Sequence, residues 1–224
     1  MPKTPMIGTT ISHYRLTRSL GAGTYGEVFE GVHSHDDHFK VAVKVVHRAL
    51  ANDPDFLAAL KAECRLLDRL KHPHIVGFRE LVLSDDHPPA MVLDLVPGGS
   101  LEDRVAAGAQ SPQWVKAVLS TCLDALAHAH DEGVVHRDIK AGNILLDARE
   151  RPQLVDFGIA KAADSGRATK TGALTGTLST MAPELFQQQA ASPASDLYAL
   201  GLVGWALLAG RHPCPEGPLT IVSG

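Results

Sequence analysis

The sequence predicts an α+β fold of two lobes, in which an antiparallel sheet with one helix comes first and a mainly helical part follows. Three observations support this order. Residues 14–47 show the two-residue alternation of strands, and residues 90–96 form a further apolar strand. One amphipathic helix, at about residues 53–70, lies between them. The two longest periodic segments after residue 97 repeat at helical spacing instead.

Length and composition are those of an ordinary globular chain. Its 224 residues are enough for one large domain or two small ones with a sizeable core. The formal charge of −4 argues against a general nucleic-acid binder, which is usually basic. Cys64, Cys122 and Cys214 lie far apart with no C-x-x-C spacing. We interpret them as small buried residues in a reducing compartment rather than as a disulfide framework.

Two segments bear on where the protein is expected to reside. Residues 1–13 contain one lysine and no apolar core, so they do not form a signal peptide. Residues 197–209 are the most apolar run, and this run is too short to span a bilayer. We therefore expect a cytoplasmic protein with no membrane segment in this chain.

The predicted strands in residues 14–47 are interrupted by the motif Gly21-Ala22-Gly23-Thr24-Tyr25-Gly26. A dinucleotide-binding motif would continue as a helix, and a Walker A loop would continue with Lys-Ser/Thr, but residues 27–32 have strand composition. The motif is therefore either a glycine hairpin folded over phosphates or an ordinary glycine-rich hairpin. Lys44, in the apolar strand that follows, favours the phosphate-binding hairpin.

The predicted helix begins at Asp53-Pro54, an N-cap followed by proline at the first turn. Its apolar positions recur every three or four residues, and Glu63 is the acidic residue on that inward face. An unpaired ammonium in an apolar strand would be costly, so Lys44 needs a partner. Glu63 can supply it; the alternative is that Glu63 is a surface residue.

The remaining elements follow from breaks and periodicity. Residues 71–74 should end the helix before a strand at 75–78, and residues 97–100 should end the strand at 90–96. Ser111-Pro112 begins a helix that stops at Gly133. Ser192-Pro193 begins another, ended by Gly210, which is apolar nearly all round and should be buried on every side.

Two polar loops carry the chemistry. The first is His136-Arg137-Asp138-Ile139-Lys140-Ala141-Gly142-Asn143, and the second is Asp156-Phe157-Gly158. Short apolar strands at 144–146 and 154–155 lie between them. Carboxylate and amide oxygens are ligands that suit Mg²⁺, which keeps part of its coordination shell for phosphate and water.

These loops resemble the catalytic loop and the metal-binding turn of the protein kinase family, in its eukaryotic-like (Hanks-type) serine/threonine branch of the bacterial kind. The resemblance covers about residues 14–215. It implies a tail at 1–13, a β-sheet N-lobe with helix C at 14–96, and a partial helical C-lobe at 97–224 that ends after helix F. The family fold continues with further helices, so we expect an exposed apolar flank on the last helix.

The resemblance also implies a role for each site residue, with ATP and Mg²⁺ or Mn²⁺ as cofactors. Asp138 would orient the attacking hydroxyl and Lys140 would offset charge on the γ-phosphoryl group. Asn143 and Asp156 would hold the metal. Lys44, paired with Glu63, would hold the non-transferred phosphates. The implied nucleotide contacts are Leu20, Gly21, Gly23, Gly26, Val28, Ala42, Asp94, Val96, Ser100 and Leu145, with Leu93 beside the adenine.

The expected substrates are Ser and Thr hydroxyls of proteins, because Lys140 and Thr177 resemble the serine/threonine branch. Residues between Gly158 and Ala182 resemble an activation loop, in which Thr171 and, less directly, Thr169 match autophosphorylated threonines; the alternative is a flexible polar loop. Thr180 departs from the large residue common there in the family.

The competing hypothesis is an inactive nucleotide-binding pseudokinase or scaffold. It rests on the missing C-terminal helices, which normally supply an arginine to Glu184; Arg211 is a poor candidate. The intact Lys44, Asp138, Asn143 and Asp156 speak against it. His33, His35 and His38 are interpreted as part of a solvated turn rather than as a metal cluster.

Overall fold

A computed structural model describes residues 6–23, 25–157, 180–187 and 189–213, which divide into two compact units. Unit 1 comprises Met1–Lys71 and Gly77–Leu95. Unit 2 comprises His72–Val76 and Val96–Gly224. The predicted order, a sheet with one helix and then mainly helices, is confirmed.

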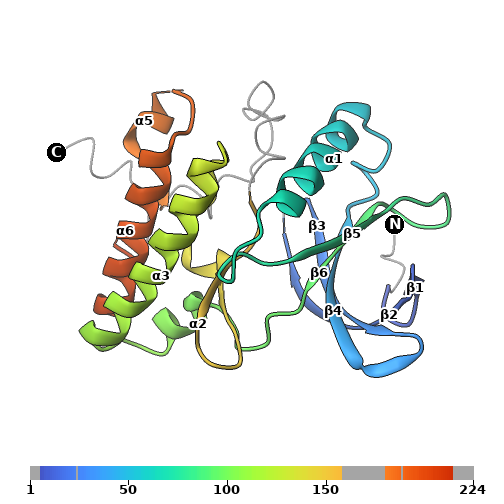
Figure 1. Cartoon of the computed structure of the whole chain (residues 1–224), viewed down its shortest axis with the longest axis horizontal. Helices are drawn as coiled ribbons and strands as arrows, with labels where there is room; N and C mark the ends of the chain where they lie inside the picture. Colours follow the sequence, from blue (N-terminus) through green and yellow to red (C-terminus); the bar gives the residue numbers. More distant parts are fainter. Residues whose placement is uncertain (1–5, 24, 158–179, 188, 214–224) are drawn as a thin grey trace. The chain divides into compact units, whose positions relative to one another are not determined.

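Unit 1 is built on an antiparallel sheet with the strand order β1-β2-β3-β4-β6-β5 (Figure 1). The predicted strands within residues 14–47 are confirmed as its long central strands. The sheet strands are β1 (Thr10–Ile11), β2 (Tyr14–Ala22), β3 (Gly26–His33), β4 (Asp36–Val46), β5 (Phe78–Val82) and β6 (Ala90–Asp94).

Side-chain alternation gives this sheet two chemically different faces. On β4, Val41, Val43 and Val45 are buried in an apolar cluster, whereas Ala42 and Lys44 point to the opposite face. The cluster also contains residues from β1, β2, β3 and β6: Ile11, Tyr14, Leu16, Phe29, Ala90 and Val92.

Helix α1 (Pro54–Arg69) begins as predicted, because the Asp53 side chain accepts hydrogen bonds from the backbone N–H groups of Asp55 and Phe56. Its inward face is the predicted one. The buried residues of α1 are Phe56, Leu60, Glu63, Cys64 and Leu67.

The expected strand at 75–78 differs from the structure. The Val76 N–H donates to the Leu154 carbonyl (3.0 Å), and the Leu154 N–H donates to the His74 carbonyl (2.8 Å). Residues 74–76 therefore bond within unit 2, and β5 begins only at Phe78. The strand predicted over 90–96 likewise ends at Asp94.

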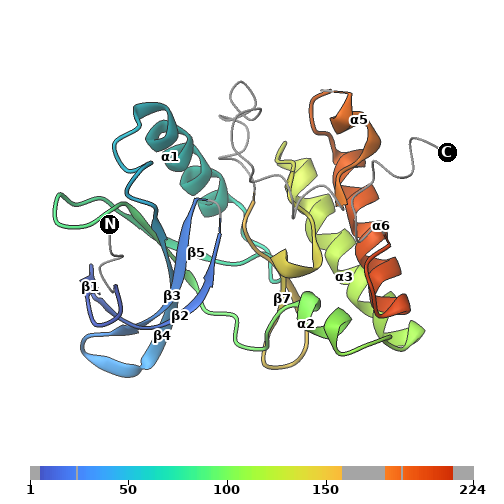
Figure 2. The same ribbon diagram turned by 180° about the vertical axis from the view of Figure 1, so that it is seen from behind.

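In unit 2, α3 (Pro112–Asp131) and α6 (Pro193–Ala209) lie side by side in both views (Figures 1 and 2). A Cβ on Gly204 would come within 2.7 Å of the Leu119 side chain, so glycine permits their close approach. Gly210 ends α6 with φ +65°, as predicted. The shorter elements are α2 (Leu101–Ala106), η1 (Ala141–Asn143), β7 (Ile144–Leu146), β8 (Pro152–Leu154) and α5 (Pro183–Phe186).

The prediction that α6 is buried on every side is wrong for the residues described. Leu197 and Leu208 are 46% and 47% exposed, and Tyr198 and Trp205 are also exposed. The expected exposed apolar flank is therefore confirmed. The sequence could not show this, because a helix that is apolar on all sides has the same pattern whether or not other elements cover each side.

Two further expectations can be compared with the structure. Cys64 and Cys122 are buried free thiols, and burial raises the pKa of each to about 12; Cys214 lies outside the described residues. Within the described part of the chain, no helix has the length and apolar character that crossing a lipid bilayer demands.

Candidate active site

The register of unit 1 gathers several predicted nucleotide contacts on one sheet face. Val28 lies opposite both Gly21 on β2 and Lys44 on β4. Ala42 lies opposite Leu93 on β6. Directly opposed residues share a face, so these side chains occupy the face turned away from the apolar cluster.

The glycine hairpin is closed by backbone hydrogen bonds. The Gly23 N–H donates to the Gly26 carbonyl (2.8 Å), and the His47 N–H donates to the Tyr25 carbonyl (2.9 Å). The His47 ring Nε2 lies 3.0 Å from the Gly23 carbonyl oxygen. Leu20, near the end of β2 that leads into the hairpin, is 38% exposed. Its apolar side chain is therefore available to contact a ligand.

Gly21 and Gly26 are glycines for different reasons. A Cβ on Gly26 would overlap the Val45 carbonyl oxygen, whereas a Cβ on Gly21 would meet no atom within 4 Å. Sheet packing therefore requires glycine at position 26 but leaves open space at position 21.

Glu63 is 4% exposed, so the alternative of a surface glutamate is wrong. A buried carboxylate requires a compensating partner. Its pairing with Lys44 on β4 stays a prediction.

The predicted nucleotide contacts that follow β6 in the sequence belong to unit 2 rather than to unit 1. Val96 and Ser100 belong to unit 2, where Ser100 caps α2: its Oγ donates to Asp103 Oδ2 (2.8 Å) and accepts from the Asp103 N–H (3.3 Å). The Ser100 backbone N–H lowers the pKa of the Asp103 carboxyl. Ser100 also forms a bridge with Leu145, so unit 2 brings two predicted nucleotide contacts together.

The first polar loop, residues 136–143, is anchored to α6 by Asp196, which is 1% exposed. Its carboxylate accepts from the backbone N–H groups of His136 (2.8 Å) and Arg137 (2.9 Å). The ring Nε2 of His130 lies 2.9 Å from the same carboxylate. The expectation that Asp196 bonds the catalytic-loop backbone is confirmed.

His136 joins the two polar loops. Its Nδ1 accepts from the Asp138 N–H (3.3 Å), and its Nε2 lies 3.1 Å from the Val155 carbonyl. Its ring also packs on that of Phe157 at 4.3 Å. Burial lowers the pKa of the imidazole, although the nearby carboxylates of Asp196, Asp138 and Asp156 oppose this shift.

Asp138, Lys140 and Asn143 form one hydrogen-bonded group. Asn143 Nδ2 donates to Asp138 Oδ2 and to the Asp138 carbonyl, both at 2.9 Å. Lys140 Nζ lies 3.2 Å from Asp138 Oδ2. Because the amide nitrogen is directed at Asp138, the Asn143 oxygen lies on the other side of the amide, which suits a hard cation.

Two residues of these loops adopt the left-handed backbone region that L-residues rarely occupy. They are Arg137 (φ +67°) and Asp156 (φ +57°). Such conformations cost free energy and persist where surrounding contacts enforce them, often at functional sites. Arg137 directly follows His136, and Asp156 lies between Val155 and Phe157, the two residues that the His136 ring contacts.

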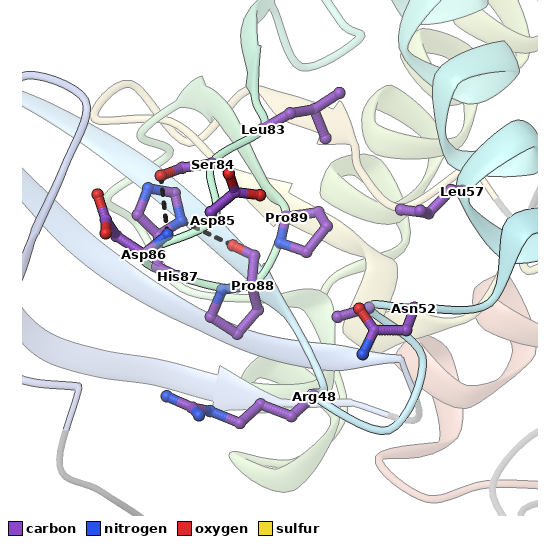
Figure 3. Close-up of a pocket in the computed structure, with 11 residues that line it drawn as sticks. Arg48, Asn52, Leu57, Leu83, Ser84, Asp85, Asp86, His87, Pro88 and Pro89 are labelled. Carbon is purple, nitrogen blue, oxygen red and sulfur yellow. Dashed lines mark hydrogen bonds between the residues drawn. The ribbon is translucent and has the colours of Figure 1, made fainter.

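A cavity of about 620 Å³ in unit 1 contains no predicted site residue (Figure 3). It is lined by the segment after β4, by Leu57 of α1 and by residues 83–89 between β5 and β6. Charges of both signs, from Arg48, Asp85 and Asp86, surround it.

His33, His35 and His38 lie at and beside the β3–β4 turn: His33 ends β3, His35 is in the turn and His38 belongs to β4. The His33 and His35 rings lie 5.8 Å apart at the β3–β4 turn, and both His35 and His38 are exposed. Across the described residues, no three His, Cys, Asp or Glu side chains are placed to hold a metal ion.

Sequence reasoning missed the partner of Glu184. Its carboxylate accepts from Ser195 Oγ at 2.6 Å, and this hydrogen bond lowers the pKa of the carboxyl. Arg211 instead lies over the Trp205 ring. Gly158, Thr169, Thr171 and Thr177 lie outside the described residues.

Comparison with known proteins gives a consistent result. The family model described as "Protein kinase domain" matches residues 14–221. "Serine/threonine-protein kinase PknA" of Mycobacterium tuberculosis is 37% identical over 97% of this chain and 52% of its own length. "Probable serine/threonine-protein kinase pknA2" of Bifidobacterium longum is 35% identical over 93% of this chain and 28% of its own length. The chain thus spans about half of the first relative and less of the second.

A solved structure has the same fold. The kinase domain of Mycobacterium tuberculosis PknI, crystallised as a mutant, matches with a TM-score of 0.71 and 30% identity. The match covers 92% of this chain and 78% of that one.

We predict that Gly26→Ala lowers the free energy of unfolding by about 1–3 kcal/mol, the usual cost of forcing atoms into a filled site. Gly21→Ala should leave it nearly unchanged, because the added methyl meets open space. Thermal unfolding followed by far-UV circular dichroism measures both. Equal losses of stability in the two variants would contradict the inference that packing requires glycine at position 26 and not at position 21.

We predict that stability falls as the pH drops below about 6.5, the ordinary histidine pKa. The unfolded state then takes up a proton that buried His136 resists, so unfolding should become easier by up to about 1.4 kcal/mol per pH unit. Both tryptophans, Trp114 and Trp205, belong to unit 2, so their fluorescence during urea unfolding reports on this unit.

His136→Asn should flatten this pH dependence, because an amide does not titrate. Substitution of exposed His35 by Asn is the matched control and should leave it unchanged. An undiminished slope in His136→Asn would show that another group is responsible.

Proposed function

Because the chain belongs to the protein kinase family, we propose that it transfers the γ-phosphate of ATP to Ser or Thr hydroxyls of proteins. The observation that carries the proposal is the group formed by Asp138, Lys140 and Asn143, which is fastened through His136 and Asp196 to the core of unit 2. Phosphoryl transfer depends mainly on positioning the reactants and on neutralising charge. This group contains a residue for each task, a carboxylate that can position a hydroxyl and an ammonium that can neutralise charge.

Asp138 handles the proton of the attacking hydroxyl in this proposal. Its carboxylate accepts from Asn143 and contacts Lys140, so it is held in one orientation near a positive charge. An ionised carboxylate that is oriented in this way can align a hydroxyl and take its proton as the new bond forms. Lys140 offsets negative charge on the transferred group.

The family generally uses ATP with a divalent cation. In this chain, Asn143 and Asp156 would hold Mg²⁺ or Mn²⁺, since one amide oxygen and one carboxylate suit a cation that keeps phosphate and water ligands. The cation supplies charge neutralisation on the phosphates when bound. Lys44, steadied by Glu63, and the glycine hairpin of Gly21, Gly23 and Gly26 bind the phosphates that are not transferred.

The base and ribose are assigned to the other predicted contacts. The Asp94 carbonyl and the Val96 N–H would bond the adenine edge, and Ser100 would lie near the ribose. The apolar walls are assigned to Leu20, Val28, Ala42 and Leu145, of which Val28 and Ala42 share a sheet face with Lys44.

The second candidate function is a nucleotide-binding scaffold without transfer. The exposed apolar flank of α6 favours it, because such a surface can serve association. The intact group around Asp138 favours the enzyme. Transfer and nucleotide binding, measured on the same sample, separate the two.

We predict that the wild-type chain with labelled ATP and Mg²⁺ phosphorylates itself or a basic protein substrate. Asp138→Asn should reduce this transfer by about 10²–10⁴-fold, the usual contribution of a general base, while ATP binding persists. The matched control is Asp131→Asn, an exposed carboxylate at the end of α3, which should retain full transfer. Folded wild type that binds ATP without transferring phosphate would favour the scaffold.

We predict phosphorylation at Thr171, with Thr169 as the second site, after incubation with ATP. Arg137, which precedes the catalytic Asp138, is a suitable partner for the added phosphate. Mass spectrometry should find the modification in wild type and not in Asp138→Asn, and Thr171→Ala should lower activity towards other proteins. Persistent activity with neither threonine modified would remove this regulatory role.

A further inference from the structure

Strand β5 contains an irregularity at Arg79. It pairs with β6 at Phe78–Leu93 and then at Glu80–Val92, so Arg79 is an extra residue without an opposite partner. A bulge of this kind bends the strand and redirects the side chain of the inserted residue.

The redirected Arg79 side chain reaches across β6. Its Nε and one terminal nitrogen both lie 2.6 Å from Asp94 Oδ1, at the end of β6. Its guanidinium carbon lies 4.8 Å from the centre of the Phe39 ring on β4. Strand β6 lies between β4 and β5 in the sheet (Figure 1). The Arg79 side chain thus connects three neighbouring strands at the same end.

Gly77 completes the arrangement. The Asp94 N–H donates to the Gly77 carbonyl at 2.9 Å. A Cβ on Gly77 would overlap the Asp94 carboxylate, so only glycine lets this carboxylate sit there. Asp94 is therefore held through its backbone and its side chain together.

This attachment lies where the sheet ends. Asp94 is the last residue of β6 to pair with β4, opposite Val41, and unit 1 itself ends at Leu95. Terminal residues of a strand open more readily than central ones. A restraint on Asp94 therefore fixes backbone groups that the ladder alone would leave free to fray.

We propose that Arg79, seated on Phe39 and beside Gly77, is a positioning residue for the adenine base, because it fixes the Asp94 carbonyl that meets the base. This inference rests on the proposed function, which assigns that carbonyl to adenine. Arg79 does not touch the nucleotide; it acts through Asp94. Its effect is confined to ligands that contain the base.

The test compares Arg79→Ala with Arg18→Ala in the full chain. Both remove an arginine that pairs with a carboxylate on a neighbouring strand of the same sheet; Arg18 of β2 pairs with Glu30 of β3 at 2.8 Å. The probes are ATP with Mg²⁺, adenosine, and inorganic tripolyphosphate with Mg²⁺, measured by calorimetry. Melting temperatures establish that each variant is folded.

Arg79→Ala should weaken ATP and adenosine by the same factor, about two- to fivefold, as expected for a half-exposed ion pair with a cation–π contact. Its tripolyphosphate affinity should equal that of wild type, and Arg18→Ala should match wild type for all three probes. In the transfer assay, Arg79→Ala should raise KM for ATP by that factor with kcat unchanged. Arg79→Lys should restore part of the loss.

Two outcomes overturn the proposal. One is equal adenosine affinity in Arg79→Ala, Arg18→Ala and wild type. The other is a loss of tripolyphosphate affinity as large as that of adenosine, which would indicate a general structural effect. A folded wild-type chain that binds neither ATP nor adenosine would instead overturn the proposed function itself, and the role of Arg79 with it.

Discussion

The arrangement of the polar loops in unit 2 depends on the hydrogen bonds that the Asp196 carboxylate accepts. This carboxylate is almost completely buried in α6, and it accepts hydrogen bonds from two successive backbone N–H groups, those of His136 and Arg137 in the first polar loop. A buried charge without such donors would be strongly destabilising, so the loop and the helix require each other. With the backbone of His136 fixed, its ring bonds the Asp138 N–H and the Val155 carbonyl, and Asp138 in turn bonds Asn143. The strained backbone at Arg137 is held by the same contacts.

Unit 1 depends on a different constraint, the register of its sheet. The pairing of Val28 with Lys44 places the ammonium on the face opposite Val43 and the apolar cluster. A slip of one residue would exchange the two faces and bury Lys44 among the valines. The close approach of Gly26 to Val45 helps to prevent such a slip, because only glycine fits against that carbonyl. Packing and chemistry thus specify the same register.

Local signals account for the elements that could be predicted. The Asp53 cap, the glycine stop at Gly210 and the alternation in β3 and β4 each act within a few residues, so they appear directly in the sequence. Helix α2 was missed although Ser100 and Asp103 carry the spacing of a capping box. The bonding of residues 74–76 to Leu154 could not be foreseen, because the partner lies almost eighty residues away.

The sequence by itself determined the family, the order of elements and the identity of the polar residues, because these depend on spacing, capping and alternation along the chain. The tertiary structure alone decided that Glu63 is buried, that the Ser195 hydroxyl bonds Glu184, and that Arg79 spans three strands to Phe39. Each of these depends on which distant side chains meet. A bulge or a buried carboxylate is specified by its surroundings in space, and no local pattern encodes those surroundings.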